Sequence, residues 1–295
     1  AEDSLEDLKE KVRKAAILGT LQATLTDFRY LRSIWKKNTE EEALLGVSLT
    51  GIMDHPVLSG QPVGGGFEPR ERLSDWLQEM RDVAIETNKK WAKRLGIAPS
   101  AAITCVKPSG TVSQLVNSAS GIHPRFAPYY IRTVRADKKD PLADYMVSAG
   151  FPAETDVTKD SNWVFSFPVR APEGAVCTSE MGAMEQLKLW KTYQDNWCEH
   201  KPSITVYYKD EEFLDVCSWM WTNFDLMSGI SLLPYSDHTY QQAPYQECTE
   251  EEYNELAKDF PVFNWEDAAL FEADTDSTSG SQELACSGAD GCELP

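Results

Sequence analysis

The stretch Ala101-Ala-Ile-Thr-Cys-Val-Lys-Pro-Ser-Gly-Thr-Val-Ser-Gln-Leu115 carries the clearest structural signal in the chain. Its first half is apolar and partly β-branched, which predicts a buried strand. The strand is interrupted at Pro108-Ser-Gly-Thr111, and a segment that could begin a helix follows. Small residues at such a junction let a ligand approach the backbone, and free N–H groups beside hydroxyls suit a phosphate. Lys107 adds a positive charge next to it. From these residues alone, phosphate binding and an ordinary tight turn are equally good interpretations.

The composition excludes several classes of protein. With 295 residues the chain can bury a large core, as one big domain or two small ones. The net charge of −19 argues against nonspecific binding of nucleic acid. No apolar run is long enough to cross a membrane, and the chain opens on acidic residues without a signal segment or an initiator Met. The seven cysteines are mostly isolated, which indicates a reducing compartment. We therefore expect a cytoplasmic protein, and a processed or truncated product.

Helical and strand-like patterns alternate along the chain. Strands are expected at 44–49, 103–106, 163–169, 203–208 and 230–233. Helices are expected from residue 5 toward Phe28, and at 74–96, 141–149, 179–197, 211–223 and after Thr249. Strands separated by helices favour an α/β protein with largely parallel strands. Five such strands could form a complete doubly wound sheet.

Several separated blocks resemble one protein family in the same order. The segment Lys107–Gln114, followed by Ser120–Arg135, resembles the large catalytic chain of ribonucleotide reductases. It is most similar to the adenosylcobalamin-dependent ribonucleoside-triphosphate reductases, known as class II. The other blocks are Leu44–Ile52, Phe165–Val169, His200–Tyr207 and Ser228–Tyr235. Together they cover nearly the whole chain, which is far more specific than any one motif.

The resemblance implies a fold different from a doubly wound sheet. It implies the second half of a ten-stranded α/β barrel of the ribonucleotide reductase type, in which each half has five parallel strands. Residues 1–272 would form this C-terminal half of the barrel, and residues 273–295 a flexible tail. An isolated half would expose unpaired strand edges. The resemblance therefore implies the missing N-terminal half as a partner, in cis or as a separate chain.

The C-terminal tail holds the second chemical feature. From Asp274 onward the composition is small, acidic and rich in Gly and Ser, which predicts a flexible segment. Cys286 and Cys292, with five residues between them, could form a disulfide, contribute to a metal site or remain idle thiols. A zinc site would need two further ligands, which the neighbouring sequence does not supply. The resemblance favours a redox shuttle pair that thioredoxin reduces, although the family's spacing is usually shorter.

The resemblance also implies the reaction and its participants. The substrates would be ribonucleoside triphosphates, converted to deoxyribonucleotides, and the cofactor adenosylcobalamin, whose contacts in this chain cannot be named. Pro108, Ser109, Gly110 and Thr111 would bind the substrate phosphates. The family's radical cysteine lies in an Asn-Pro-Cys-Gly-Glu loop, which is absent from this sequence. We therefore expect the chain to be inactive alone.

Two other functions fit parts of the sequence. A noncatalytic nucleotide-binding or assembly module would keep the phosphate turn and give the tail no redox role. A small α/β enzyme with Ser109 as its nucleophile lacks the Gly-x-Ser-x-Gly elbow. Cys105 is interpreted as a buried strand residue and Tyr129-Tyr130 as packing. His123-Pro-Arg125 follows the phosphate turn, and it could either orient that turn or serve a structural role.

Overall fold

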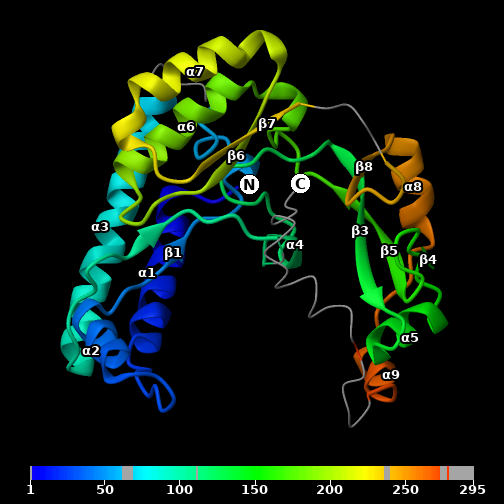
Figure 1. Ribbon diagram of the computed structural model, residues 1–295, viewed down its shortest axis with the longest axis horizontal. Coiled ribbons are helices and arrows are strands. Elements are labelled where there is room, and N and C mark those ends of the chain that lie inside the picture. The colour runs from blue at the N-terminus through cyan, green and yellow to red at the C-terminus, as the bar shows by residue number, and fades with distance from the viewer. Residues whose placement is uncertain (1, 62–68, 111, 236–239, 273–277, 279–295) are drawn as a thin grey trace. The chain divides into compact units, whose positions relative to one another are not determined.

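The computed structural model describes residues 2–61, 69–110, 112–235, 240–272 and 278 (Figure 1). It divides into two compact units. Unit 1 comprises Ala1–Arg125 and Pro172–Tyr235, and unit 2 comprises Phe126–Ala171 and Ser236–Pro295. Helices and strands are mixed in both units, which confirms the α/β class. The range 1–272, expected as a single domain, contains parts of both units, and the boundary after residue 272 stays a prediction.

The strands of unit 1 are short and parallel. β1 (Val47–Ser48) pairs with β2 (Thr104–Cys105), and β6 (Ile204–Tyr208) pairs with β7 (Ile230–Pro234). The segment before β6 is joined to β2, because the backbone N–H groups of Glu199 and His200 both donate to the carbonyl of Thr104. Four of the five expected strands are therefore confirmed as parallel. The complete barrel of the expected fold stays a prediction.

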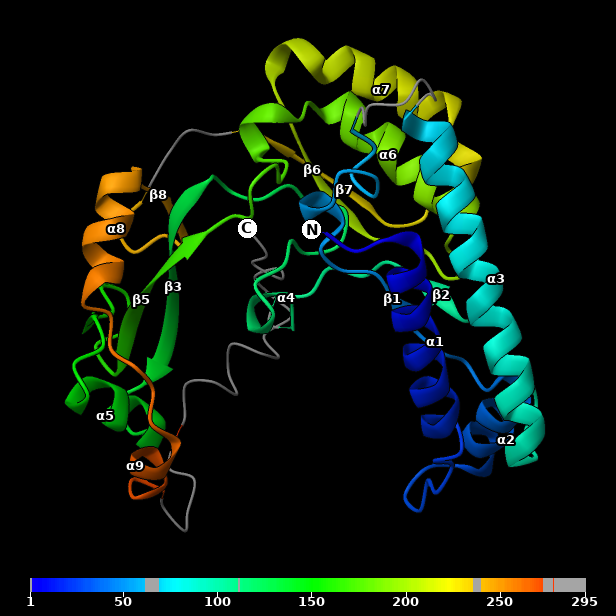
Figure 2. The same ribbon diagram turned by 180° about the vertical axis from the view of Figure 1, so that it is seen from behind.

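Long helices bury the core of unit 1. α1 (Leu5–Gln22) lies beside α3 (Pro69–Leu95) in both views (Figures 1 and 2). α6 (Ala183–Asn196) contacts α3, β6 and α7 (Phe213–Thr222), while α2 (Ser33–Glu42) buries none of its residues. Trp190 and Trp197 are completely buried in this core. A connection that contains a helix is what parallel pairing requires, because the chain must return to the same end of the sheet.

The ends of three helices differ from the sequence prediction. α1 ends at Gln22 and does not continue toward Phe28, because the N–H groups of Thr24 and Leu25 donate three residues back in a tightened turn. α3 begins at Pro69 and not at Ser74, since proline fits the first helical turn, where its missing N–H costs nothing. α6 begins at Ala183 and not at 179, after the separate short helix η2 (Thr178–Glu180). The stop at Gly96 is confirmed, with φ of 70° in the left-handed region.

The sheet of unit 2 is antiparallel, in the order β4-β5-β3-β8. β3 (Tyr129–Asp137) and β5 (Asn162–Arg170) pair over their whole length, while β4 (Ala153–Thr155) and β8 (Tyr245–Glu247) flank them. The strand expected at 163–169 is confirmed as β5. Its expected parallel direction is wrong, because the sequence pattern identified no strand at 129–137 and so missed its neighbour.

Aromatic side chains form the core of unit 2. Phe151 and Phe165 are buried, and Phe260 and Phe263 pack against them. Three helices accompany the sheet: α5 (Pro141–Ser148), α8 (Glu250–Lys258) and α9 (Trp265–Ala269). The helix predicted after Thr249 is confirmed with its capping box, in which Glu252 N–H donates to Thr249 Oγ1 at 3.2 Å.

Among the helices of the described ranges, none combines the length and the apolar composition that a membrane span requires.

Candidate functional site

The predicted phosphate turn lies between β2 and α4 (Val112–Leu115), in unit 1. Of its four residues, Pro108 and Ser109 are partly buried, Gly110 is exposed, and Thr111 lies outside the described residues. The strand, the turn and the helix start therefore follow one another as the sequence predicted.

Ser109 uses its polar groups inside the turn. Its N–H donates to Ser120 Oγ at 2.8 Å, and its Oγ accepts from Ser113 N–H at 3.2 Å. Its carbonyl accepts from the Ser113 hydroxyl. These bonds oppose a nucleophilic role, because the hydroxyl serves the backbone and no base contacts it among the bonds of Ser109 described here. Ser109 shapes the turn, while Gly110 leaves its backbone open to a ligand.

The charge of Lys107 is held against the segment that leads into β6. Its Nζ donates to the carbonyl of Lys201 at 2.7 Å and to Ser203 Oγ at 3.3 Å. Its backbone N–H donates to Ser48 Oγ at 3.0 Å. The residue therefore ties the exit of β2 to both neighbouring strands and keeps a positive charge at the start of the turn.

His123 connects the loop that follows the turn to β6. Thr205 N–H donates to Nε2 of His123 at 2.9 Å, so Nδ1 carries the proton and donates to the carbonyl of Ser120 at 2.9 Å. Burial lowers the pKa of His123, which favours this neutral form. Gln186 adds a parallel link, since its Nε2 donates to the carbonyls of Ile122 and Thr205. His123 thus orients the segment, as its position in the sequence suggested.

A buried ion pair holds the other end of that loop. Arg125 and Asp54 have side chains only 3% and 5% exposed, and their Nε–Oδ1 distance is 2.8 Å. The Arg125 guanidinium also donates to the side chain and the carbonyl of Asn117, at 3.0 and 2.6 Å. Asp54 Oδ2 accepts from Ala119 N–H at 2.7 Å. Sequence reasoning missed Asp54 and Asn117, because Asp54 is 71 residues from Arg125 along the chain and neither residue belongs to a recognisable motif.

Among the described cysteines, Cys105 and Cys198 are buried and poorly suited to thiol chemistry. Burial raises the pKa of Cys105, and it raises the pKa of Cys198 to about 12. Cys105 lies in β2 and is buried, which agrees with its interpretation as a strand residue. The predicted redox pair, Cys286 and Cys292, lies outside the described residues. Within the described part of the chain, no group of three His, Cys, Asp or Glu side chains is arranged to hold a metal.

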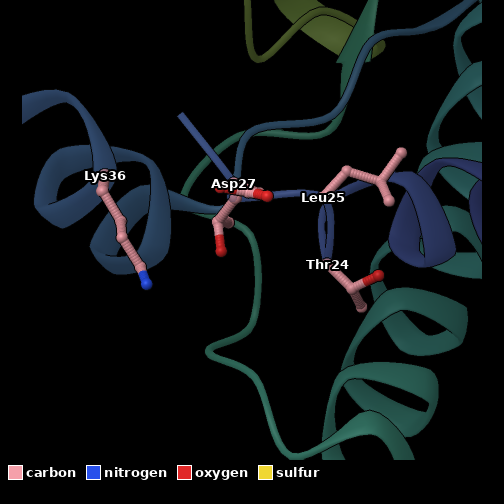
Figure 3. A pocket seen from close by; sticks show the side chains of 5 residues that line it. Thr24, Leu25, Asp27 and Lys36 are labelled. Atoms are coloured by element: carbon pink, nitrogen blue, oxygen red, sulfur yellow. The ribbon is translucent and has the colours of Figure 1, made fainter. Parts of the chain in front are cut away.

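A separate depression of about 370 Å³ lies where α1 connects to α2 (Figure 3). Its lining consists of Thr24, Leu25, Thr26, Asp27 and Lys36. None of the residues predicted from the sequence to be functional lines it. Four of these side chains come from the connection and that of Lys36 from α2. The two charged ones form ion pairs within their own segments, Asp27 with Arg29 and Lys36 with Glu40.

Comparison with known proteins gives one consistent set of relatives in sequence. An adenosylcobalamin-dependent ribonucleoside-triphosphate reductase of Levilactobacillus brevis is 29% identical over 240 residues, or 75% of this chain and 32% of that protein. A probable enzyme of the same name from Dictyostelium discoideum is 29% identical over 86% of this chain and 32% of its own length. The Euglena gracilis enzyme is 28% identical over 87% of this chain and 34% of its own length. The chain spans about a third of the length of the curated relatives it matches.

The fold leads to the same relatives. A crystal structure of a B12-dependent (class II) ribonucleotide reductase superposes with a TM-score of 0.77 at 24% identity, over 92% of this chain and 40% of that one. No family model matches the chain. The chain is therefore homologous to part of these reductases and has the fold of the class II enzyme, which confirms the resemblance seen in the sequence.

Proposed function

We propose that this homologue of the adenosylcobalamin-dependent reductases forms the C-terminal part of a catalytic unit that reduces ribonucleoside triphosphates to 2′-deoxyribonucleoside triphosphates. The observation that carries the proposal is the coincidence of sequence and fold. Similarity extends over three quarters or more of the chain in relatives that share one name, and the class II fold covers 92% of it.

In this proposal the phosphate turn binds the substrate. Pro108, Ser109, Gly110 and Thr111 would lie against the phosphates, with Gly110 allowing the closest approach because it has no side chain. The bonds of Ser109 to Ser113 and Ser120 support the assignment, because they hold the turn in one conformation before a ligand arrives. Lys107 supplies a positive charge at the base of the turn.

Cys286 and Cys292 would return reducing equivalents to the active site. Loss of the 2′-hydroxyl as water requires two electrons, which an active-site dithiol supplies as it becomes a disulfide. The tail dithiol would exchange with that disulfide, and thioredoxin would then reduce the tail.

The rest of the catalytic unit would come from the missing N-terminal half. The chain has no Asn-Pro-Cys-Gly-Glu segment to carry the radical cysteine, so we expect it to be inactive alone. Adenosylcobalamin would supply the initiating radical when bound. The depression at α1–α2, of about 370 Å³, lies in the range of pockets for drug-sized ligands, which are smaller than a corrin. We therefore assign no cobalamin contact to this chain.

The first test is an activity assay on native protein captured through its tail, together with whatever is bound to it. Deoxynucleotide formation from a ribonucleoside triphosphate and a dithiol would be measured with and without adenosylcobalamin. Product that requires the cofactor supports the reductase. If a captured partner supplies the radical cysteine and no product forms, the noncatalytic binding module is favoured instead.

The tail has its own test in the same assay. Cys286→Ser should allow about one turnover with thioredoxin as reductant, while a small dithiol restores continued turnover. Cys217→Ser is the matched control, because Cys217 is exposed in the described structure and has no proposed redox role. Full thioredoxin-driven turnover by Cys286→Ser would remove the shuttle.

A further inference from the structure

The ion pair between Asp54 and Arg125 stands at the centre of a hydrogen-bond network that no catalytic step above uses. Asp54 Oδ1 accepts from Arg125 Nε at 2.8 Å, and Oδ2 accepts from Nη2 at 2.9 Å, so the pair is bidentate. Both side chains are almost completely buried. A bidentate pair fixes direction as well as distance, because the guanidinium fork is planar.

The backbone on both sides of this pair is itself anchored. Val176 N–H donates to the carbonyl of Met53, next to Asp54, and Arg125 N–H donates to the carbonyl of Val176, both at 2.8 Å. Thr178 N–H then donates to the carbonyl of Arg125 at 2.8 Å. The segment 176–178 therefore holds both partners, and the ion pair forms a fixed support within unit 1.

The loop after the phosphate turn is attached to this support. Arg125 donates to both oxygens of Asn117, and Asp54 accepts from Ala119 N–H. Asn117 has a φ of 46°, in the left-handed region that a residue with a side chain adopts at a cost of about 1 kcal/mol. The two bonds from Arg125 hold the residue in that conformation, so the reversal of the chain depends on the guanidinium.

Hydrogen bonds continue from this reversal to the turn itself. Ser118 N–H donates to the carbonyl of Ser113 at 2.8 Å, and Ser113 N–H donates to Ser109 Oγ at 3.2 Å. Ser120 Oγ, just beyond Ala119, accepts from Ser109 N–H at 2.8 Å. A displacement of residues 117–120 would therefore shift Ser109 through its bond to Ser120 and through its bond to Ser113.

We propose that Asp54 and Arg125 are positioning residues for the phosphate turn: they hold the loop 112–120 so that the turn keeps its binding conformation. This inference rests on the proposed function, since it takes the turn as the site for substrate phosphates. The pair contacts neither Pro108 nor Gly110 in any bond described here. It acts through Asn117, Ala119 and the serine bonds.

The experiment removes both charges together. Breaking one partner of a buried pair leaves an uncompensated charge and endangers folding, whereas replacing both with apolar residues of similar volume is often neutral for stability. The variant Asp54→Leu/Arg125→Met should therefore stay folded, which its thermal midpoint checks. Binding of inorganic tripolyphosphate to the full chain would be measured by calorimetry, and hydrogen exchange followed over residues 109–120.

We expect tripolyphosphate to bind about tenfold more weakly to this variant, with faster exchange confined to 109–120. Arg125→Lys is the second variant: it keeps the charge beside Asp54 but lacks the fork that reaches Asn117, so its affinity should be intermediate. The control is Asp156→Leu/Arg135→Met, an ion pair in unit 2 with a buried carboxylate and a partly exposed guanidinium, which should leave binding unchanged.

The two readouts separate the failure of this inference from that of the proposed function. Wild-type affinity in a folded Asp54→Leu/Arg125→Met variant overturns the positioning role. If the unaltered chain does not bind tripolyphosphate, the phosphate assignment loses its support. Hydrogen exchange over residues 109–120 is then the test of the positioning role. Unchanged exchange over 109–120 then overturns the positioning role, and faster exchange supports it.

Discussion

Units 1 and 2 build sheets by opposite strategies. In unit 1 the strands are two to five residues long, parallel, and separated by connections that contain helices as long as the 27 residues of α3. In unit 2, β3 and β5 each have nine residues and pair antiparallel along their whole length. Short parallel strands contribute little pairing of their own, so unit 1 depends on its large apolar core. Unit 2 depends more on its sheet and a small aromatic cluster.

The order of segments along the chain shows how one polypeptide forms both a parallel and an antiparallel sheet. Phe126–Ala171, the first part of unit 2, lies within the connection between β2 and β6 of unit 1. It enters through β3 and leaves through β5, and Tyr129 is paired with Arg170. Because these two ends are adjacent, the segment can be inserted without separating the parallel strands. All the described residues of the proposed phosphate turn belong to unit 1.

The largest expected effects come from the two cores. Trp190→Ala in unit 1 and Phe165→Ala in unit 2 each remove a buried ring and should lower the free energy of unfolding by about 3–5 kcal/mol. Hydrogen exchange resolved by segment should show lost protection confined to the mutated unit. Trp221→Ala is the matched control, because Trp221 is 86% exposed and its loss should change stability by less than about 0.5 kcal/mol. Equal loss of protection in both units after either core change would mean that they unfold together.

A smaller effect is expected from Asp156 in unit 2. Burial opposes its ionisation, but hydrogen bonds from Thr158 and Arg135 outweigh burial and hold the pKa of its carboxyl below the usual 3.8. Its stabilisation is therefore present above pH 3.8 and is lost as the pH falls through the lowered pKa. Asp156→Ala should destabilise unit 2 by about 1–3 kcal/mol at neutral pH, because the donors lose their acceptor. Urea unfolding at pH 7 and pH 3 checks this: a variant as stable as the wild type at pH 7 would contradict it.

The two capping boxes allow a like-for-like test between units. Ser4 caps α1 in unit 1 and Thr249 caps α8 in unit 2, each through a side-chain oxygen that accepts from the third helical N–H. Ser4→Ala and Thr249→Ala should each cost about 1 kcal/mol, measured by chemical unfolding. Glycine at either position should cost only a few tenths of a kcal/mol, since glycine is tolerated as a cap. If alanine and glycine proved equal, the caps would not contribute as described.

The smallest change is one of pH dependence in unit 1. Burial lowers the pKa of His123 from the usual 6.5, against the opposing effect of its bond to Ser120. The unfolded chain therefore binds a proton more readily than the folded one, and unit 1 loses stability as the pH falls below about 6.5 toward the lowered pKa. His123→Gln should reduce this dependence between pH 7 and pH 5.5, followed by unfolding at each pH. The pH dependence that remains in this variant is expected to come from His55, because burial also lowers its pKa. Asp156 acts only below pH 3.8, so the two units should respond in different pH ranges.

Local patterns in the sequence predicted much of this structure. The helix start after Thr249, the helix stop at Gly96 and the strand before Pro108 all lie where expected, because caps, turns and apolar periodicity depend on neighbours along the chain. The blocks that resemble class II reductases were also visible in the sequence, and the comparisons confirm them.

The direction of β5 and the support of the phosphate turn were decided only by tertiary structure. An isolated strand pattern contains no information on which neighbour it pairs with, so the pattern of β5 alone does not show that its neighbour β3 runs antiparallel to it. Asp54 carries no local motif, yet folding buries it against Arg125 and leaves each as the other's charge partner. Local patterns were enough to predict the strands of unit 1, most of its long helices and the family that the chain resembles, because propensities and motif order act along the chain. Burial, which acts between distant segments, decided which polar residues meet.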